Sequence, residues 1–163
     1  MKYTIVDKQD YWKNKNKYIT MIKELFKNDD SKIANIKEIT SHLDYIFSKD
    51  ITNDSMLILN IKNNRIISMI NFLQYNNVEN LWCLFSLFTL KSERKKGYGK
   101  DILKYGLEKV RKKQAKILIS GIEEDNEESI SLHKKIGFVY SGKNWDEIAD
   151  GFPENHLGFI YEF

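Results

Sequence analysis

The chain has 163 residues, the usual length of one domain and enough to bury a core of its own. Its 26 basic and 23 acidic residues leave a net charge of +3, too small for general attraction to nucleic acid or to an anionic membrane. The single cysteine excludes an intrachain disulfide, and no apolar run approaches the roughly 18 residues of a membrane-spanning helix. We therefore expect one cytoplasmic domain over residues 1–163.

The first part of the chain predicts one strand followed by two helices. Residues 2–6 alternate weakly, as a short strand does, and Asp10 is a candidate N-cap of the first helix. The apolar stripe of that helix consists of Tyr18, Ile19, Ile22, Leu25 and Phe26. Asn35, with Glu38 three residues later, resembles a capping box and predicts the start of a second helix.

Three strands are expected next. Residues 56–61 and 66–75 are typical of a hairpin joined by the Asn pair at 63–64, because Asn tolerates the positive φ of a tight turn. A second Asn pair at 76–77 predicts another turn. Residues 81–90 are apolar almost without interruption, which indicates a central strand buried on both faces.

From about residue 99 onward, helices and strands alternate. A helix over 99–113, a strand over 117–122, a helix over 127–136 and a strand from Phe138 extend the preceding strand into a βαβαβ unit. A last strand over 157–163 follows an irregular stretch. This order predicts a mixed α/β (α+β) fold.

The loop between the strand at 81–90 and the next helix is typical of a phosphate-binding segment, here named the 94–100 loop. It consists of Arg94, Lys95, Lys96, Gly97, Tyr98, Gly99 and Lys100. Unpaired N–H groups and the helix dipole at the first helical turn can hold a pyrophosphate, and two glycines let the backbone approach it. Ile102 replaces the third glycine of a dinucleotide motif, and Asp101 replaces the Ser/Thr that ends a P-loop.

At these residues the chain resembles the GNAT superfamily of acetyl-CoA-dependent N-acetyltransferases. The pattern Arg94-x-x-Gly97-x-Gly99 is similar to the pyrophosphate loop of that family. A second element resembles the second family motif through Asn126, Ser129, Leu132, His133, Lys135, Gly137 and Phe138. Both motifs stand in the family's order, one strand apart, and their joint occurrence is more specific than either alone.

The resemblance implies a GNAT-like fold: a mixed, mainly antiparallel central sheet of six to seven strands, about four helices, and a central pair of strands that splay apart. Acetyl-CoA would lie between the splayed strands, with its pantetheine arm on main-chain groups of Phe88 and Thr89 and its pyrophosphate on the 94–100 loop. Asn126 matches an Asn that hydrogen-bonds the cofactor arm. His133 matches a Tyr that donates a proton to the departing thiolate.

The departure from Tyr to His at position 133 changes the chemistry of the proton donor. A His with an unperturbed pKa of about 6.5 is partly protonated near neutral pH, and its neutral form still donates one N–H. Helical spacing puts Ser129, Leu132, His133 and Ile136 on one face, so His133 is expected to border both the core and the cofactor. The alternative is that the ring fills space or bonds a carbonyl.

The resemblance implies direct attack of a neutral primary amine, on a small molecule or peptide, at the thioester. No base is assigned; the acids that qualify by charge alone are Glu79, Asp146, Glu147 and Asp150. The aromatic and acidic residues of 145–152 suit a pocket for a cationic acceptor, such as a polyamine, an aminoglycoside or a peptide N-terminus. Cys83 is expected to pack in a core strand rather than act as a nucleophile, and no metal-ligand spacing is present.

Two other interpretations stay open. The basic residues of 109–116 allow a nucleic-acid surface, although cations in the last turn of a helix also complement its dipole, so we expect no nucleic acid. A non-catalytic acyl-CoA-binding or sensor module is the second alternative, motivated by His133 and by the unassigned base. A homodimer is compatible with the strand edges.

Overall fold

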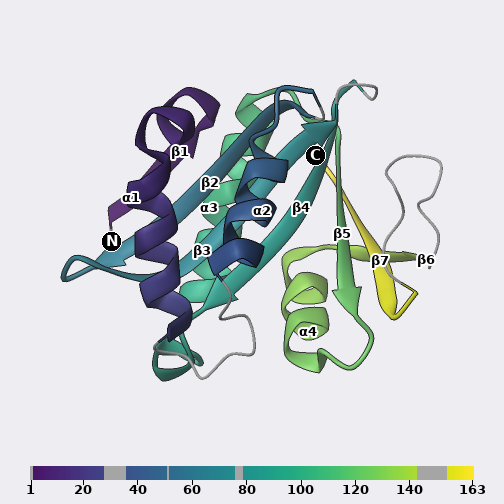
Figure 1. Ribbon diagram of the computed structural model, residues 1–163. Coiled ribbons are helices and arrows are strands. Elements are labelled where there is room, and N and C mark those ends of the chain that lie inside the picture. Colours follow the sequence, from purple (N-terminus) through teal and green to yellow (C-terminus); the bar gives the residue numbers. More distant parts are fainter. Residues whose placement is uncertain (1, 28–35, 51, 76–78, 143–153) are drawn as a thin grey trace.

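The computed structural model describes residues 2–27, 36–50, 52–75, 79–142 and 154–163 (Figure 1). The helices are α1 (Lys8–Lys27), α2 (Ile36–Ile46), α3 (Tyr98–Lys112) and α4 (Glu127–Ile136), with a short 3-10 turn at Lys91–Glu93. The strands are β1 (Lys2–Asp7), β2 (Thr52–Lys62), β3 (Arg65–Tyr75), β4 (Leu81–Thr89), β5 (Ile117–Glu123), β6 (Val139–Gly142) and β7 (His156–Glu162). None of the helices in these ranges is long and apolar enough to cross a membrane.

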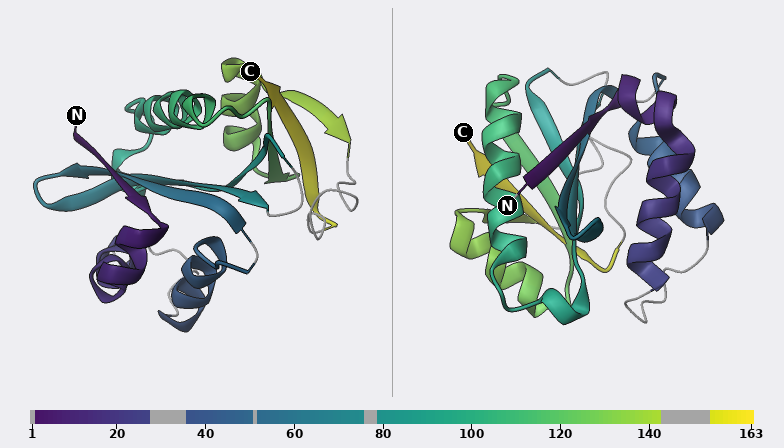
Figure 2. Two further views of the ribbon diagram at one scale, coloured as in Figure 1. Left: turned by 90° about the horizontal axis from the view of Figure 1, so that it is seen from above. Right: turned by 90° about the vertical axis from the view of Figure 1, so that its left-hand side faces the viewer.

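The strands form one sheet in the order β1-β2-β3-β4-β5-β7-β6, with α1 and α2 on one face and α3 and α4 on the other (Figure 2). Every neighbouring pair is antiparallel except β4 and β5, which run parallel and are connected by α3. This is the mixed, mainly antiparallel fold that the family resemblance predicts.

The two parallel strands separate part of the way along their length, as predicted. Pairing between β4 and β5 ends at Leu84 and Ser120, after which β4 pairs with β3 alone and β5 with β7. The register of β3 and β4 shifts at this point, so that Phe85 is an extra residue in β4. A bulge bends its strand and increases the local twist, which accounts for the divergence visible in Figure 1.

Apolar residues fill both faces of the sheet. One core lies beneath α1 and α2 and includes Ile22 and Leu43, and the other lies beneath α3 and includes Phe72 and Leu103. The helix α3 approaches the sheet closely at Gly106, where an added Cβ would lie 2.4 Å from the ring of Phe72. Gly106 thus fixes the distance between α3 and β3.

The element order predicted from the sequence is confirmed, and Asn63 and Asn64 have the positive φ values, 51° and 60°, expected of the hairpin turn. The N-cap prediction for Asp10 is wrong, because α1 begins at Lys8 and the Asp7 carboxylate accepts a hydrogen bond from Asp10 N–H at 2.8 Å. Asn35 and the Asn pair at 76–77 lie outside the described residues.

Two predictions about strands need correction. The strand β4 is buried on both faces only as far as Leu84, since Phe85 at the bulge is 37% exposed and residues 86–89 are half-buried. The predicted βαβαβ unit is also interrupted, because β7 lies between β5 and β6 and pairs with both. Antiparallel insertion of a C-terminal strand depends on long-range pairing, which local sequence patterns do not encode.

Candidate functional site

The N-terminus of α3 presents main-chain donors at the end of β4. Gly97 is the N-cap residue, and no side chain of the described residues hydrogen-bonds to the cap. Asp101 N–H donates to Gly97 O at 3.0 Å as the first bond of the helix. The N–H groups of Tyr98, Gly99 and Lys100 precede this bond and have no acceptor within the helix, so they can bind an anion.

The two glycines of the 94–100 loop have different roles. Gly97 has a φ of +89°, a left-handed conformation that side chains with a Cβ rarely adopt. An added Cβ at Gly99 would lie 3.3 Å from Thr89 Oγ1 and 3.7 Å from Leu132 Cδ2. Gly97 therefore shapes the turn, and Gly99 lets the start of α3 pack against the end of β4 and against α4.

The charged residues of the loop divide into two groups. Arg94 Nε donates to Thr89 O at 3.1 Å, and Lys96 Nζ lies 3.2 Å from the Glu93 carboxylate, so both hold the loop together. All four basic residues of the loop are exposed, and those outside these two contacts are Lys95 and Lys100. Asp101 adds a negative charge in the first turn of α3, which offsets part of this positive potential.

The splayed segment of β4, residues 85–89, faces a gap instead of β5. In an antiparallel pair, the main-chain groups of alternate residues point to the partner strand. Leu90 N–H donates to Ile67 O at 2.9 Å, so Leu90 and, by alternation, Phe88 face β3. This register turns the main-chain groups of Leu87 and Thr89, rather than those of Phe88, toward the gap.

The two predicted site residues of the second motif are Asn126, which is the N-cap residue of α4, and His133, which lies within that helix. Asn126 Oδ1 caps the helix by accepting from Ser129 N–H at 3.1 Å. His133 faces inward and is 1% exposed, with its ring edge-to-face against Phe138 at a centroid distance of 4.8 Å. Its side chain approaches β5, where Ser120 Oγ lies 3.5 Å from Nε2.

Hydrogen bonding fixes the tautomer of His133. Nδ1 lies 2.8 Å from the carbonyl oxygen of Ser129, which only accepts, so the ring proton is on Nδ1 and Nε2 faces Ser120 as an acceptor. Burial lowers the pKa of His133, and the bond to Ser129 opposes this only in part. The neutral ring therefore dominates at neutral pH, contrary to the partial protonation expected from an unperturbed pKa.

The other predicted residues lie away from this arrangement or outside the described chain. Cys83 is 2% exposed and burial raises the pKa of its thiol to about 12, which suits packing rather than nucleophilic attack. Glu79 precedes β4 and lies at the opposite end of that strand from the 94–100 loop. Asp146, Glu147, Asp150 and the rest of 145–152 are outside the described residues.

The basic residues near the end of α3 have local partners. Lys113 Nζ pairs with the Asp54 carboxylate at 2.6 Å, and Lys109 Nζ lies 4.6 Å from the centroid of the Tyr105 ring. The last turn of α3 also contains Arg111 and Lys112, where cations complement the helix dipole. These contacts favour a structural role for the cluster over a phosphate-binding surface.

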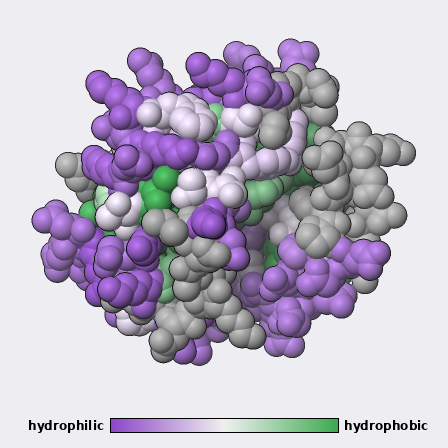
Figure 3. All heavy atoms as spheres, in the orientation of Figure 1, coloured by the Kyte–Doolittle hydropathy of each residue, from purple (hydrophilic) through white to green (hydrophobic). Residues whose placement is uncertain are grey.

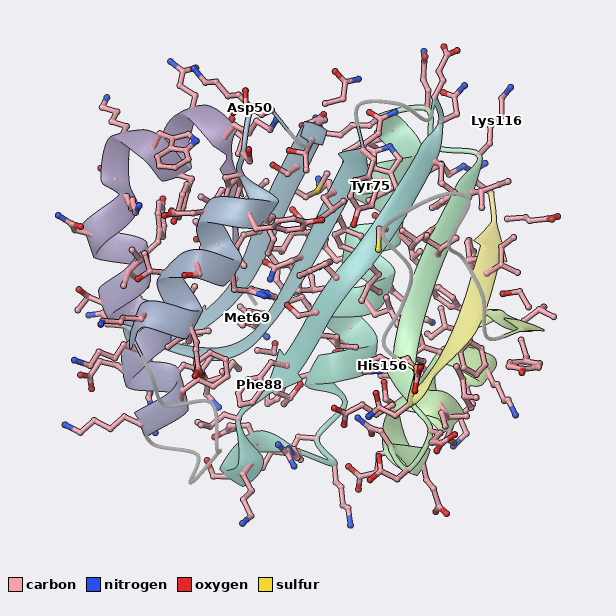
Figure 4. The ribbon with its side chains drawn as sticks, turned by 45° about the vertical axis from the view of Figure 1, so that its right-hand side comes forward. Asp50, Met69, Tyr75, Phe88, Lys116 and His156 are labelled. Carbon is pink, nitrogen blue, oxygen red and sulfur yellow. The ribbon has the colours of Figure 1, made fainter. Side chains whose placement is uncertain are left out.

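A cavity of about 260 Å³, here named the α2 cavity, lies beside the splayed segment of β4. Its walls come from α1, α2, β3 and β4, and it includes Met69 and Phe88, which Figure 4 labels on the side of the sheet covered by α2. On the same face of the molecule, Figure 3 shows patches of hydrophobic atoms among hydrophilic ones. No sequence pattern marks this cavity, because its lining residues resemble ordinary core positions.

Comparison with known proteins places this geometry in a family. Residues 19–138 match the model of the acetyltransferase (GNAT) family. No curated protein matches the chain. Solved structures with the same fold include ribosomal-protein-alanine N-acetyltransferase from Brucella melitensis, with a TM-score of 0.66, 15% identity, and 100% of both chains covered.

Two further structures share this fold. The PaiA N-acetyltransferase from Thermoplasma acidophilum, solved in complex with coenzyme A, has a TM-score of 0.64 and 15% identity over 100% of both chains. An acetyltransferase from Thermus thermophilus has a TM-score of 0.73 and 8% identity, with 100% of this chain and 98% of that chain covered. At these identities the likeness concerns the fold alone.

Proposed function

Because the chain belongs to the acetyltransferase (GNAT) family, we propose that it transfers the acetyl group of acetyl-CoA to a primary amine of a small molecule or peptide. The observation that carries this proposal is the uncapped N-terminus of α3 at the end of a strand that has lost its parallel partner. The first feature suits a pyrophosphate, which needs N–H donors. The second suits the amide groups of a pantetheine arm, which can pair with a free strand edge.

The proposal gives each part of the site a role in binding the acyl donor. The 94–100 loop holds the diphosphate, through main-chain N–H groups and the exposed ammonium groups of Lys95 and Lys100. Main-chain groups of Leu87 and the N–H of Thr89 bond the arm, while Phe88 lines the adjoining α2 cavity with its side chain. Asn126 uses Oδ1 to cap α4, so its Nδ2 is the group proposed for the cofactor.

Acetyl-CoA supplies an activated acetyl group as a thioester. The acceptor amine attacks in its neutral form: the C–N bond forms, the C–S bond breaks, the nitrogen loses a proton and the sulfur gains one. The chain contributes alignment of the two partners, which lowers the barrier by several kcal/mol and at most about 11 kcal/mol. A water chain can remove the amine proton, so the reaction does not require an acid or base in direct contact with the nitrogen.

His133 remains the proposed donor of the proton to sulfur, under a condition set by its surroundings. Its Nδ1–H is used by Ser129, so Nε2 has a proton to donate only in the imidazolium form. Because burial lowers the pKa of His133, this form becomes scarcer as pH rises through that lowered pKa. Donation by His133 is therefore favoured by low pH.

The experiment that tests the function measures thiol release from acetyl-CoA in the presence of a panel of primary amines, with mass spectrometry of the acetylated products. The expected result is release that needs both the protein and an amine. Calorimetric binding of coenzyme A without turnover across the panel would replace this proposal with a non-catalytic acyl-CoA-binding module. Absence of both binding and turnover would remove the proposal entirely.

A further inference from the structure

The α2 cavity is apolar over most of its surface. Its hydrophobic lining includes Ile22, Phe26, Ile39, Leu43, Met69 and Phe88. A dry cavity of about 150 Å³ holds a benzene ring. At about 260 Å³, the α2 cavity has room for an aromatic ring together with a short alkyl arm.

The cavity offers little charge to a cationic ligand. Among the described lining residues, the titratable side chains are Glu38 and His42. Glu38 is exposed and lies in the first turn of α2, while burial lowers the pKa of His42 and keeps its ring neutral at neutral pH. A ligand with several ammonium groups would lose hydration here without gaining matching carboxylates.

A hydrogen-bonded polar pair, Asn71 and Ser86, lies on this side of the sheet, and Ser86 is the member of the pair that lines the cavity. Asn71 is fully buried, and its Nδ2 donates to Ser86 Oγ at 2.6 Å, whereas Oδ1 has no hydrogen-bond partner among the described residues. Asn71 lies on the same face of β3 as Met69, two residues away, and both Met69 and Ser86 line the cavity. Asn71 does not itself line the cavity, so it acts on a ligand through Ser86, whose Oγ has a second lone pair that can accept an amine N–H.

The polar pair is next to the place where the reaction would occur. Ser86 lies in the splayed segment of β4, beyond the last pair with β5 at Leu84. The cavity also reaches Leu87 and Phe88 of the same segment. An amine held at Ser86 would thus have its body in the cavity and its nitrogen beside the gap between β4 and β5.

We propose that the α2 cavity binds the acceptor, and that this acceptor is a primary amine on an apolar, uncharged body, such as an arylalkylamine. The inference rests on the proposed acetyltransferase function and adds a substrate class to it. It differs from the cationic acceptor expected from the composition of residues 145–152, which lie outside the described residues. Ser86 is the polar group that orients the amine, Asn71 holds the Ser86 hydroxyl in place, and the apolar walls select the body of the amine.

Steady-state kinetics with phenethylamine and spermidine as probes test the inference. The kcat/KM for phenethylamine is expected to be at least about tenfold higher than that for spermidine, because loss of a ring-sized apolar contact costs about that factor or more. Ser86→Leu fills the floor of the cavity and is expected to raise KM for phenethylamine at least about tenfold, with coenzyme A binding unchanged. Ser41→Leu adds the same side chain at an exposed position of α2 and is expected to leave both values unchanged.

The possible outcomes separate this inference from the function on which it rests. Preferred turnover of spermidine, or an unchanged KM in a folded Ser86→Leu variant, would overturn the substrate class and leave the acetyltransferase proposal intact. Absence of thiol release with every amine would overturn both. Melting temperatures of the two variants, compared with that of the unsubstituted protein, establish that each is folded.

Discussion

The imidazole of His133 is held by α4 and β5, and its protonation state decides what it can contribute. Replacing it with Phe is expected to lower kcat by about 10²-fold at about pH 6, the usual contribution of a positioned acid, with little change in acetyl-CoA affinity. The ratio of wild-type to variant kcat should shrink as pH rises, because burial lowers the pKa of His133 and removes the donor form. Measurement of kcat between about pH 5.5 and about pH 8.5 checks this. A ratio that stays constant with pH would assign His133 to packing alone.

Among the helices and strands, the contact between α3 and β3 depends on the missing side chain of Gly106. Gly→Ala inside a helix ordinarily stabilises by about 0.5–1 kcal/mol. Here the new Cβ would overlap the buried ring of Phe72, so Gly106→Ala is expected to destabilise the fold by about 1–3 kcal/mol. Urea unfolding measures this difference, with the exposed Lys104→Ala on the same helix as the control. A gain in stability for Gly106→Ala would show that the helix is not in contact at this point.

Local patterns are sufficient to predict the elements but not how all of them pair. Helical stripes, the Asn turn at 63–64 and the glycine loop are short-range signals, and each is present where the sequence indicates. The bulge at Phe85 and the position of β7 between β5 and β6 depend on register between distant strands. Neighbouring residues therefore do not predict them.

The same distinction applies to the candidate site. The 94–100 loop is predictable because its two glycines are close in sequence and lie at the start of a helix, Gly97 at the N-cap and Gly99 in the first turn. The α2 cavity is not, because its walls come from four separate elements and most of its residues are apolar, as core residues are. The sequence also does not predict that the main-chain groups of Leu87 face the gap. Their direction is set by the register with β3 and not by the residue type.

Across the complete fold, one parallel pair in an otherwise antiparallel sheet creates the site. The parallel direction of β4 and β5 requires α3 as a crossover, which places the N-terminus of this helix at the end of β4. The bulge at Phe85 then separates the strands on the same side (Figure 1). The main-chain N–H donors at the start of α3 and the gap between β4 and β5 are therefore consequences of a single topological feature.

The proposed enzyme depends on main-chain N–H groups at the start of α3 that hold the diphosphate of coenzyme A, and calorimetric titration measures this binding. Gly97→Val forces a β-branched residue into a left-handed conformation and is expected to weaken coenzyme A binding at least about tenfold, while pantetheine, which lacks the diphosphate, binds as before. Gly142→Val is the matched control, since Gly142 also has a positive φ but lies in open space on β6. Wild-type protein that fails to bind coenzyme A, or a Gly97→Val variant that binds it as tightly as wild type, would contradict this role for the start of α3.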